Sequence, residues 1–415
     1  MDLNAEAGDG PKIVASPRPL LVRCLLRDQR AHVEPVERQL GDAAEFVYDE
    51  AWDPETVARE RVDLILCVND YPYDVARCLD AARAEGIPSL VLQDGILEWR
   101  CQYANPLFGA GGGAPQHQPV LADKIACIGP SSARHMASWG NGTRIEVTGM
   151  PKLDAIAGTS HSAPRRPGRR LLVMTAKKPW YDEAQRAVID RSLVDLRSFL
   201  ESRPDIEVVW RVTRGLSEKL GVSNRLKDLE TAELSTVLAE VDAVVTTPST
   251  AILEAMLVGR PVAVLDYHNS PRFVQTAWTI SSPHHLGEVL PELLDPPESK
   301  MLFQRACLSD NLWCEGAAAP RVARLIEEMA RRGAECRERG DSLRLPANML
   351  RFPEAFGGGA LPPLQSLYPG VPVFSTSDPE SLQVRLARLE KDLQSLRRGD
   401  LATRVGRGLR RLVSK

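Results

Sequence analysis

The sequence predicts an α/β protein with two Rossmann-like domains. Apolar, partly β-branched runs of strand length alternate with helical segments over residues 16–163 and again over 164–345, the pattern of parallel sheets with helical crossovers. The chain has 415 residues, enough for two domains with separate cores. A Pro- and Arg-rich stretch at 164–170 indicates the linker between them.

The stretch 241–268 is the clearest strand–helix–strand unit. An apolar run ends before Pro248, and Ser249 and Thr250 then carry hydroxyls that can accept hydrogen bonds from the first turn of a helix. The next residues are apolar nearly all round, so this helix should be buried, and Gly259 is a typical residue to end it. The pattern predicts strand 241–246, helix 251–258 and strand 261–265.

Two features of this unit indicate a binding site. The helix start offers unpaired backbone N–H groups, two hydroxyls and the positive end of the helix dipole, which suit a phosphate. Glu254 lies alone in the apolar helix, one turn after Thr250 on the same face. An unpaired carboxylate in a packed helix is costly, and a ribose diol would supply hydrogen-bond donors. The alternative is an ordinary capped helix in which Glu254 pairs with a nearby Arg or reaches solvent.

The stretch resembles the nucleotide-binding segment in the C-terminal domain of GT-B glycosyltransferases, particularly the bacterial polysaccharide and CDP-glycerol glycerophosphotransferase branch. In that family a strand ends in a Ser/Thr turn, and a helix carries a Glu before a Gly-x-Pro, as Glu254 precedes Gly259 to Pro261 here. The resemblance implies that the two domains face each other across a cleft. It also implies that Ser249 and Thr250 bind the donor's phosphates and that Glu254 binds its ribose. It extends loosely over about residues 15–330. The nucleotide-activated donor would be a substrate, and no cofactor is implied.

In the first domain, the end of one predicted strand carries a candidate catalytic acid. Ligands of parallel sheets bind at the carboxyl ends of the strands, and Asp94 directly follows the run 87–93. The related transferases often have a His-Gly where this chain has Asp94-Gly95. By this resemblance Asp94 is the candidate general base, with Glu98 in reserve. The alternative is an ordinary Asp-Gly turn, and the change from His to Asp leaves the acceptor class open. The other predicted strands are 19–26, 44–48, 62–68, 124–128 and 144–148, and the helices are 36–40, 53–61, 73–85 and 130–139.

Strand ends in the second domain supply further polar candidates. Lys177 and Arg211 suit an anionic ligand in the cleft, and His268 would face the same cleft. Solvated lysines and a structural histidine are the alternatives. Related proteins often have Arg-x-His-Pro at the position of Arg211, but Thr213 stands where the His would be, which weakens the case for CDP-glycerol as donor. The remaining predicted strands are 171–174 and 206–210, with helices at 182–201, 231–240 and 319–332 and a strand and loop near the base at 224–229.

Several other segments carry expectations of their own. The glycine-rich stretch 108–119 predicts a mobile loop near the acceptor, and 149–154 is similar to the Gly-x-Pro-Arg-x-Asp segment that ends the first domain in the related transferases. In GT-B proteins a late helix returns to the first domain, a role that 319–332 would suit. Residues 1–15 are expected to be disordered, 346–378 to be a Pro/Gly-rich linker, and 379–415 to combine a short leucine seam with a basic amphipathic end.

Composition excludes several other classes of protein. The formal net charge is -3, which argues against nucleic acid as a partner. The eight Cys are scattered without a C-x-x-C pair, and neither a His/Cys cluster nor an Asp-x-Asp is present, so no metal site is predicted. No apolar run approaches the roughly 20 residues of a membrane span. The expected location is the cytoplasm, and the tail 379–415 either contacts the inner face of the membrane or self-associates.

Together these observations favour a metal-independent glycosyltransferase. It would move a sugar, or a related polyol phosphate, from a nucleotide-activated donor to a carbohydrate or lipid-linked acceptor in surface polysaccharide or glycolipid assembly. Two alternatives remain open. One is a sugar-nucleotide 2-epimerase of the same fold, whose first domain usually carries a His-Val-Glu segment. The other is a non-catalytic polysaccharide-assembly protein that retains the fold.

Overall fold

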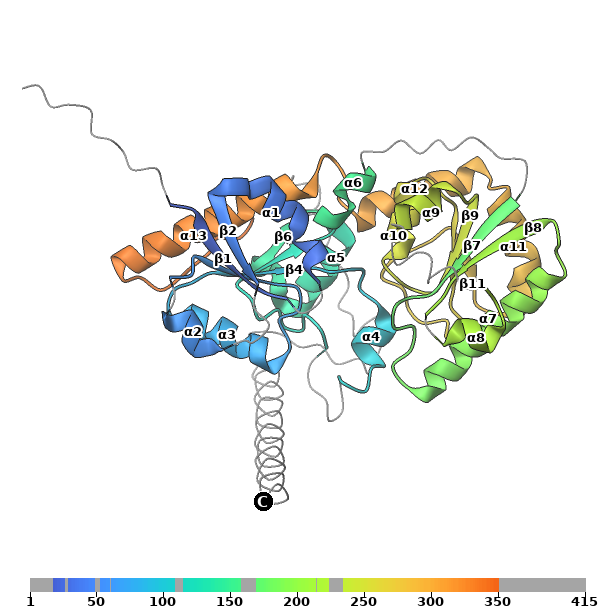
Figure 1. Cartoon of the computed structure of the whole chain (residues 1–415), viewed down its shortest axis with the longest axis horizontal. Coiled ribbons are helices and arrows are strands. Elements are labelled where there is room, and N and C mark those ends of the chain that lie inside the picture. The colour runs from blue at the N-terminus through green and yellow to red at the C-terminus, as the bar shows by residue number, and fades with distance from the viewer. Residues whose placement is uncertain are drawn as a thin grey trace, which may run out of the picture.

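Two α/β domains lie side by side in the computed structural model (Figure 1). The segments 1–15, 224–229 and 379–415, for which the sequence carries expectations, lie outside the described residues, as does most of the linkers 164–170 and 346–378. The structure describes residues 18–26, 29–48, 53–59, 61–108, 115–157, 169–213, 215–223 and 234–350.

The first domain is built on a parallel sheet with the strand order β2-β1-β3-β4-β5-β6. Every strand predicted for this domain is confirmed, and each lies within its predicted range. The order reverses at β1, because β2 pairs with one side of it and β3 with the other. The strands are β1 (Leu20–Leu25), β2 (Ala44–Tyr48), β3 (Leu64–Cys67), β4 (Ser89–Leu92), β5 (Lys124–Cys127) and β6 (Ile145–Val147).

The second domain has a parallel sheet with the order β11-β10-β9-β7-β8. The order reverses at β7, between β8 and β9, and ligands of doubly wound sheets bind at such a reversal. The four strands predicted over this part are confirmed. The edge strand β11 was not predicted, because its three residues are too few to show a periodic pattern. The strands are β7 (Arg169–Met174), β8 (Ile206–Arg211), β9 (Ala243–Thr246), β10 (Val262–Leu265) and β11 (Trp278–Ile280).

Helices cover both faces of each sheet. Alternate residues of a strand point to opposite faces, so in β3 Leu64 and Leu66 pack in one apolar cluster while Ile65 and Cys67 pack in another. The predicted helices are confirmed, whereas α4, α6, α8, α11 and α12 were not predicted. The helices are α1 (Glu34–Leu40), α2 (Pro54–Arg59), α3 (Tyr73–Ala84), α4 (Trp99–Tyr103), α5 (Pro130–Met136), α6 (Asp154–Ala157), α7 (Glu183–Glu201), α8 (Leu216–Leu220), α9 (Leu234–Ala239), α10 (Ala251–Leu257), α11 (Leu286–Leu294), α12 (Glu298–Asn311) and α13 (Ala318–Arg339).

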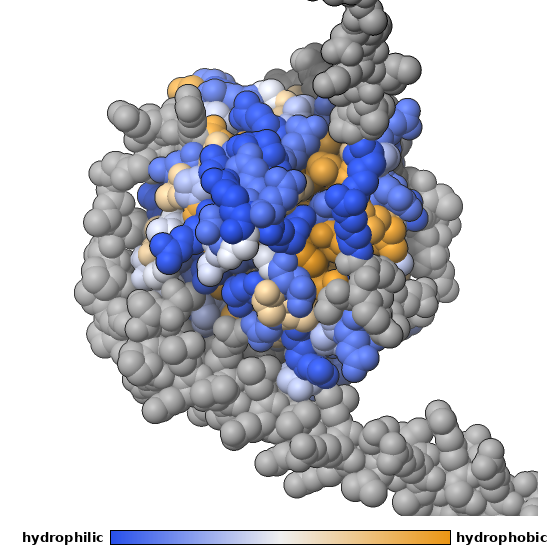
Figure 2. All heavy atoms as spheres, turned by 90° about the vertical axis from the view of Figure 1, so that its left-hand side faces the viewer, coloured by the Kyte–Doolittle hydropathy of each residue, from blue (hydrophilic) through white to orange (hydrophobic). Residues whose placement is uncertain are grey.

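The late helix α13 returns to the first domain, as expected. Its apolar side, including Val322 and Ile326, packs with the strand residues of the first sheet. Its outer side carries ion pairs such as Arg331–Glu328, and hydrophilic side chains cover much of the coloured surface at this end of the molecule (Figure 2). The chain therefore crosses between the domains a second time before α13 begins.

The segment 149–154 fixes that second crossing. Both carboxylate oxygens of Asp154 accept hydrogen bonds from the first backbone N–H groups of α13, at 2.7 and 2.8 Å, which caps the helix. Gly149 has φ +83°, and a Cβ there would overlap the carbonyl oxygen of Trp313. The segment 149–154 therefore holds the chain where it crosses back to the first domain.

Candidate functional site

A cavity of about 840 Å³ lies between the two domains. It is formed where strands of both sheets end at their carboxyl side. Asp94 comes from the first domain after β4, whereas Lys177, Arg211 and Glu254 come from the second domain, around the reversal at β7. The structure thus brings together most of the residues that the sequence predicted for a ligand site: Asp94, Glu98, Lys177, Arg211, Ser249, Thr250 and Glu254.

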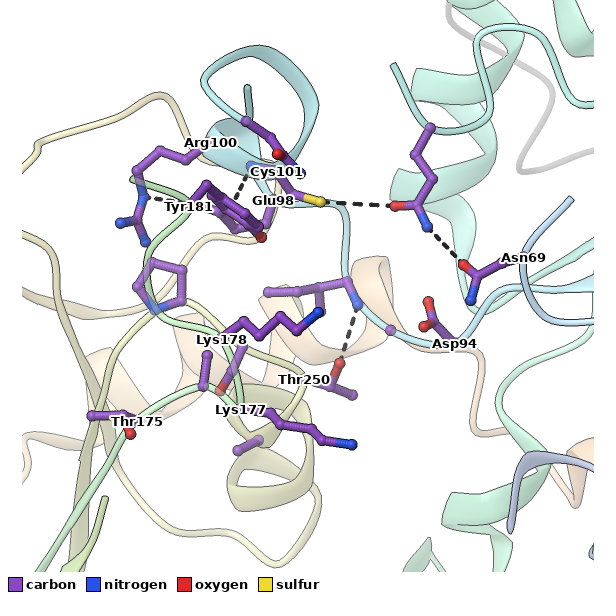
Figure 3. A pocket seen from close by; sticks show the side chains of 18 of the residues that line it. Asn69, Asp94, Glu98, Arg100, Cys101, Thr175, Lys177, Lys178, Tyr181 and Thr250 are labelled. Atoms are coloured by element: carbon purple, nitrogen blue, oxygen red, sulfur yellow. Dashed lines mark hydrogen bonds and ion pairs between the residues drawn. The ribbon is translucent and has the colours of Figure 1, made fainter. Parts of the chain in front are cut away.

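Cationic side chains line the second-domain wall of the cavity. Lys177 and Lys178 lie in the loop after β7, and Figure 3 shows both side chains reaching into the space on the side of Asp94. Arg211 is the last residue of β8. Burial lowers the pKa of its guanidinium, and the carboxylate of Glu254 opposes this shift. Among the described residues its buried Nε has no hydrogen-bond partner, so this wall presents positive charge to an anionic ligand.

The loop that carries the two lysines is held in place by threonines. The Ala176 backbone N–H donates to Thr247 Oγ1 at 2.8 Å, and the Thr213 hydroxyl donates to the Ala176 carbonyl at 2.6 Å. The Thr213 N–H also donates to Thr175 Oγ1 at 2.8 Å. Thr213 therefore fixes the loop after β7.

Glu254 projects from α10 into the cavity without a partner. No hydrogen bond or ion pair joins its carboxylate to any residue that the structure describes. Burial raises the pKa of Glu254, and the nearby charges of Lys152 and Arg211 oppose that shift. The predicted alternative, in which Glu254 pairs with an arginine, is not what the structure shows. A half-buried carboxylate that faces a cavity and lacks donors is suited to a ligand that brings hydroxyl groups.

The expected capping role of the hydroxyls before α10 is wrong. Thr250 occupies the N-cap position, but its φ of −59° and ψ of −23° are already helical, and its side chain caps no N–H of the first turn. A capping hydroxyl needs an extended backbone at this position. Instead, Thr250 Oγ1 accepts a hydrogen bond from the backbone N–H of Ile96 in the first domain, at 3.3 Å. The hydroxyl of Ser249 lies 3.4 Å from that of Thr246. Both predicted residues line the cavity.

Asp94 lies opposite the cationic wall, in a turn fixed by a buried glutamine. Gln93 donates to the carbonyl of Gly95 at 2.7 Å and to the Ser132 hydroxyl at 3.0 Å. Burial raises the pKa of Asp94, and the charges of His117 and Lys152 oppose that shift. Asp94 Oδ2 accepts a hydrogen bond from Gln29 Nε2 at 3.2 Å. No other described residue donates a hydrogen bond to this carboxylate. The carboxylate is therefore available to accept a proton from a ligand in the cavity.

Glu98, the reserve candidate for the base, has both oxygens engaged. Its Oε2 accepts from the Cys101 backbone N–H at 2.6 Å and so caps α4, while Oε1 pairs with Arg100 Nε at 3.0 Å. Arg100 is buried and also donates to the Pro179 carbonyl across the domain boundary, at 3.1 Å. Glu98 lines the cavity, yet its contacts are those of a structural residue.

The structure does not bring His268 to the cavity. It follows β10, which is separated from β7, the strand at the reversal, by β9. Burial and then the charge of Arg100 lower the pKa of its imidazole, and its buried Nε2 has no hydrogen-bond partner among the described residues. A strand end alone was thus too weak a signal, because only the ends near the reversal meet the cleft.

A His-Val-Glu tripeptide is present in this chain at residues 32–34, between β1 and α1. Val33 is fully buried. Burial lowers the pKa of His32 to about 3, with a further contribution from Lys152, and Glu34 lies 3.6 Å from Arg30 at the surface. None of the three residues lines the cavity. The tripeptide therefore gives the site no support for the epimerase alternative.

Sequence reasoning missed most of the polar residues on the first-domain wall. Gln29 and Asn69 follow β1 and β3, and Gln116 lies in the stretch 108–119 that was predicted to be a loop near the acceptor. Residues 109–114 of that loop lie outside the described part of the chain. Gln29 and Asn69 could have been identified because they follow two strands that are neighbours in the sheet. The sequence alone does not show that these strands are neighbours.

Neither a metal cluster nor a membrane-spanning helix is found among the described residues. No group of three or more His, Cys, Asp or Glu side chains among them could hold a metal ion. No helix over the same residues has the length and apolar composition of a membrane span.

The fold, with two Rossmann-like domains and a cavity between them, is that of the GT-B class. Solved structures that share it include a protein designated a UDP-N-acetylglucosamine 2-epimerase from Listeria monocytogenes, with a TM-score of 0.54 and 15% identity over 75% of this chain and 96% of that one. S. aureus MnaA, in a structure with UDP, gives a TM-score of 0.54 and 13% identity over 76% and 97% of the two chains.

A variant of the wall teichoic acid polymerase TagF shares the fold as well, with a TM-score of 0.52 and 11% identity over 77% of this chain and 90% of that one. No protein-family model matches the sequence, and no curated protein matches it. At these identities the likeness is one of fold. Because the structures that share the fold include one named an epimerase and one named a polymerase, the fold does not by itself identify the reaction.

Proposed function

We propose that this protein is a metal-independent glycosyltransferase of the GT-B type. It moves a sugar, or a related polyol phosphate, from a nucleotide-activated donor to a hydroxyl of a carbohydrate or lipid-linked acceptor. The reaction belongs to the assembly of surface polysaccharide or glycolipid.

One observation carries the proposal. Glu254 lacks any donor among the described residues and faces the same cavity as the cations Lys177, Lys178 and Arg211. A nucleoside diphosphate offers the complementary pattern, because its ribose diol has two hydroxyl donors next to a dianionic diphosphate. The opposite wall holds Asp94, the other available carboxylate. A donor site and a proton acceptor thus face each other across one cavity.

In the proposed reaction, the acceptor hydroxyl displaces the nucleotide from the donor. Asp94 takes the proton of the acceptor hydroxyl while the hydroxyl oxygen forms a bond to the sugar carbon that carries the diphosphate. The bond from that carbon to the diphosphate oxygen breaks, and its electron pair stays with the nucleoside diphosphate. For transfer of a polyol phosphate, the acceptor oxygen attacks phosphorus instead and a nucleoside monophosphate leaves. Lys177, Lys178 and Arg211 stabilise the charge that develops on the leaving phosphate, a role that metal ions perform elsewhere.

The compartment and partners follow from the same proposal. All eight cysteines are free, which suits a reducing cytoplasm. We place the donor and acceptor in the cleft and assign no role to nucleic acid. The tail 379–415, outside the described residues, is proposed to contact the inner face of the membrane or to self-associate.

The direct test is thermal melting of the full chain with UDP, CDP, GDP, TDP and CMP, each in EDTA. A nucleotide at 100 times its dissociation constant should stabilise the protein by about 2.7 kcal/mol. The variant Glu254→Ala should lose this stabilisation. Glu201→Ala is the matched control, because Glu201 ends α7 with an exposed side chain paired with Arg197.

Each outcome decides between the hypotheses. If one nucleotide stabilises wild type and Glu201→Ala but not Glu254→Ala, the result supports the donor site and identifies the nucleobase of the donor. No stabilisation by any nucleotide would contradict the proposal and favour a non-catalytic assembly protein. If the matching nucleotide sugar is converted to its 2-epimer without an acceptor, the epimerase is the correct alternative.

A further inference from the structure

Three amide side chains form a directed chain of hydrogen bonds along the first-domain wall of the cavity. Gln116 Nε2 donates to Asn69 Oδ1 at 2.9 Å, and Asn69 Nδ2 donates to Gln29 Oε1 at 3.2 Å. Gln29 Nε2 then donates to Asp94 Oδ2 at 3.2 Å. All four residues line the cavity, and they come from four different loops of the first domain.

The carboxylate of Asp94 sets the orientation of all three amides. An ionised carboxylate only accepts hydrogen bonds, so the NH₂ group of Gln29 must face Asp94, and its carbonyl must face Asn69. The same argument orients Asn69 and then Gln116. Each NH₂ group has two N–H donors and uses one in this chain. Each amide therefore keeps a second N–H donor, unpaired among the described residues, and spare acceptor capacity on its carbonyl.

The first-domain wall carries no available positive charge among the described lining residues. Arg100 is buried and engaged by Glu98 and by the Pro179 carbonyl. Asp94, in contrast, accepts a hydrogen bond from the neutral amide of Gln29 and forms no ion pair with any described residue. The other cations that line the cavity, Lys177, Lys178 and Arg211, lie on the second-domain wall. An anionic acceptor group placed beside Asp94 would meet repulsion there, whereas a neutral group would not.

An aromatic pair lines the same cavity as the amides. The rings of Tyr71 and Phe108 both line the cavity and meet edge to face, with centroids 5.7 Å apart and an interplanar angle of 81°. Pockets that combine aromatic surface with a few placed amide groups suit ligands with apolar faces and polar edges. A sugar ring has this character, since its C–H faces are apolar and its edge carries hydroxyls.

We propose that Gln29, Asn69 and Gln116 form a subsite for an uncharged sugar, whose hydroxyls bind the spare amide groups and whose reacting hydroxyl is directed at Asp94. The proposal rests on the proposed function, because it names the acceptor class of the same site. The charge of Asp94 disfavours an acceptor that ends in a phosphate or a carboxylate at this subsite.

The test measures sugar binding separately from nucleotide binding. Saturation-transfer NMR on the full chain would use the methyl glycosides of glucose, galactose and N-acetylglucosamine, with methyl glucuronide and glucose 6-phosphate as charged counterparts. Spectra are recorded with and without the nucleotide found by thermal melting. The variants are Asn69→Leu and Gln116→Met, with Gln275→Met as the control, because Gln275 is an exposed amide on the second domain.

We expect at least one neutral glycoside to bind and the charged sugars to bind at least about 10-fold more weakly. Asn69→Leu and Gln116→Met should each weaken the glycoside about 3- to 10-fold, the effect of a lost hydrogen bond. They should leave nucleotide stabilisation unchanged, as should Gln275→Met. Glu254→Gln should have the opposite effect: it should weaken nucleotide binding and leave glycoside binding unchanged.

Three results would overturn the subsite: equal or tighter binding of the charged sugars, glycoside binding that the two amide variants leave unchanged, or no signal from any neutral glycoside while a nucleotide binds. Failure of the donor site looks different. In that case no nucleotide stabilises the wild type, whereas the sugar spectra recorded without nucleotide still report on the amide wall.

Discussion

Gly95 lies directly against the hydroxyl of Thr250, so that a Cβ on Gly95 would overlap Thr250 Oγ1. The same hydroxyl accepts the hydrogen bond from the backbone N–H of Ile96. The turn after β4 in the first domain and the start of α10 in the second thus meet in a contact that only a glycine fits. This contact holds Asp94 and Glu254, the two available carboxylates, on opposite walls of one cavity.

Gly95→Ala should loosen this contact between the domains. The new methyl group must displace the Thr250 hydroxyl, so we expect a loss of about 1–3 kcal/mol in the free energy of unfolding, typical of overpacking. In a Thr250→Ala background the overlapping oxygen is gone, and Gly95→Ala should cost much less. Urea denaturation of the two single variants and the double variant measures this coupling. Additive effects would mean that the two residues do not meet in solution.

Glu254→Gln should stabilise the free protein at neutral pH. Burial raises the pKa of Glu254, which means that the folded state penalises its charged form. The neutral amide avoids this penalty but cannot bind a diol as a charged acceptor does. We therefore expect a higher melting temperature without ligand and a nucleotide affinity lower by about 10- to 150-fold, the range of a charge-assisted hydrogen bond. A melting temperature below that of wild type would show that Glu254 is paired in solution.

The stability of the wild type should also depend on pH through Glu254. The ordinary pKa of the side chain is 4.5, and the folded value is raised. Between these two values the folded protein binds more protons than the unfolded chain, so this contribution to stability falls as pH rises. Glu254→Gln should remove that part of the slope. Urea midpoints from about pH 4 to about pH 8, compared between the two proteins, give the difference.

Asp94→Asn and Glu98→Ala should have different consequences. Loss of a general base lowers kcat by about 10²- to 10⁴-fold, and Asp94→Asn should do so while nucleotide stabilisation is retained. Glu98→Ala removes the cap of α4 and should destabilise the protein by about 0.5–2 kcal/mol. In wild type the transfer rate should fall as pH drops through the raised pKa of Asp94, because the protonated carboxyl cannot accept a proton. A pH profile unchanged in Asp94→Asn would assign the base elsewhere.

Arg211→Met should weaken the donor without weakening the fold. Burial already lowers the pKa of Arg211, so its charge is costly in the free protein. We expect nucleotide affinity to fall by about 10- to 150-fold and the melting temperature of the free protein to stay the same or rise. Arg305→Met is the control, since Arg305 lies exposed on α12 and pairs with Glu298. Isothermal titration calorimetry with the nucleotide identified above compares the two variants.

Much of the fold could be predicted because buried parallel strands leave a strong pattern. β3 and β4 are buried along their whole length, and α7 occupies most of the range that was predicted for it, with Asp182 as its N-cap. The elements that were missed are short or weakly patterned. β11 has three residues, and α12 exposes apolar side chains such as Leu302 and Phe303, which blur its amphipathic pattern.

Candidate site residues could be predicted where a polar residue stands out within or next to an apolar helix or strand. Glu254 is an acid in an apolar helix, and Asp94 directly follows a buried strand. Thr250 was misassigned as a helix cap because its partner, Ile96, is more than 150 positions away along the chain. His268 was included for its strand end, although the strand order places that end away from the cavity.

The sequence by itself determined the alternation of strands and helices, the two-domain plan and the acid in α10, because these depend on local periodicity and on residue type. Only the tertiary structure decided that Gln29, Asn69 and Gln116 form one hydrogen-bonded chain that ends on Asp94. The physical reason is the sheet order. Strands that are distant in sequence pair side by side, and their ends then place amides and carboxylates within hydrogen-bond reach.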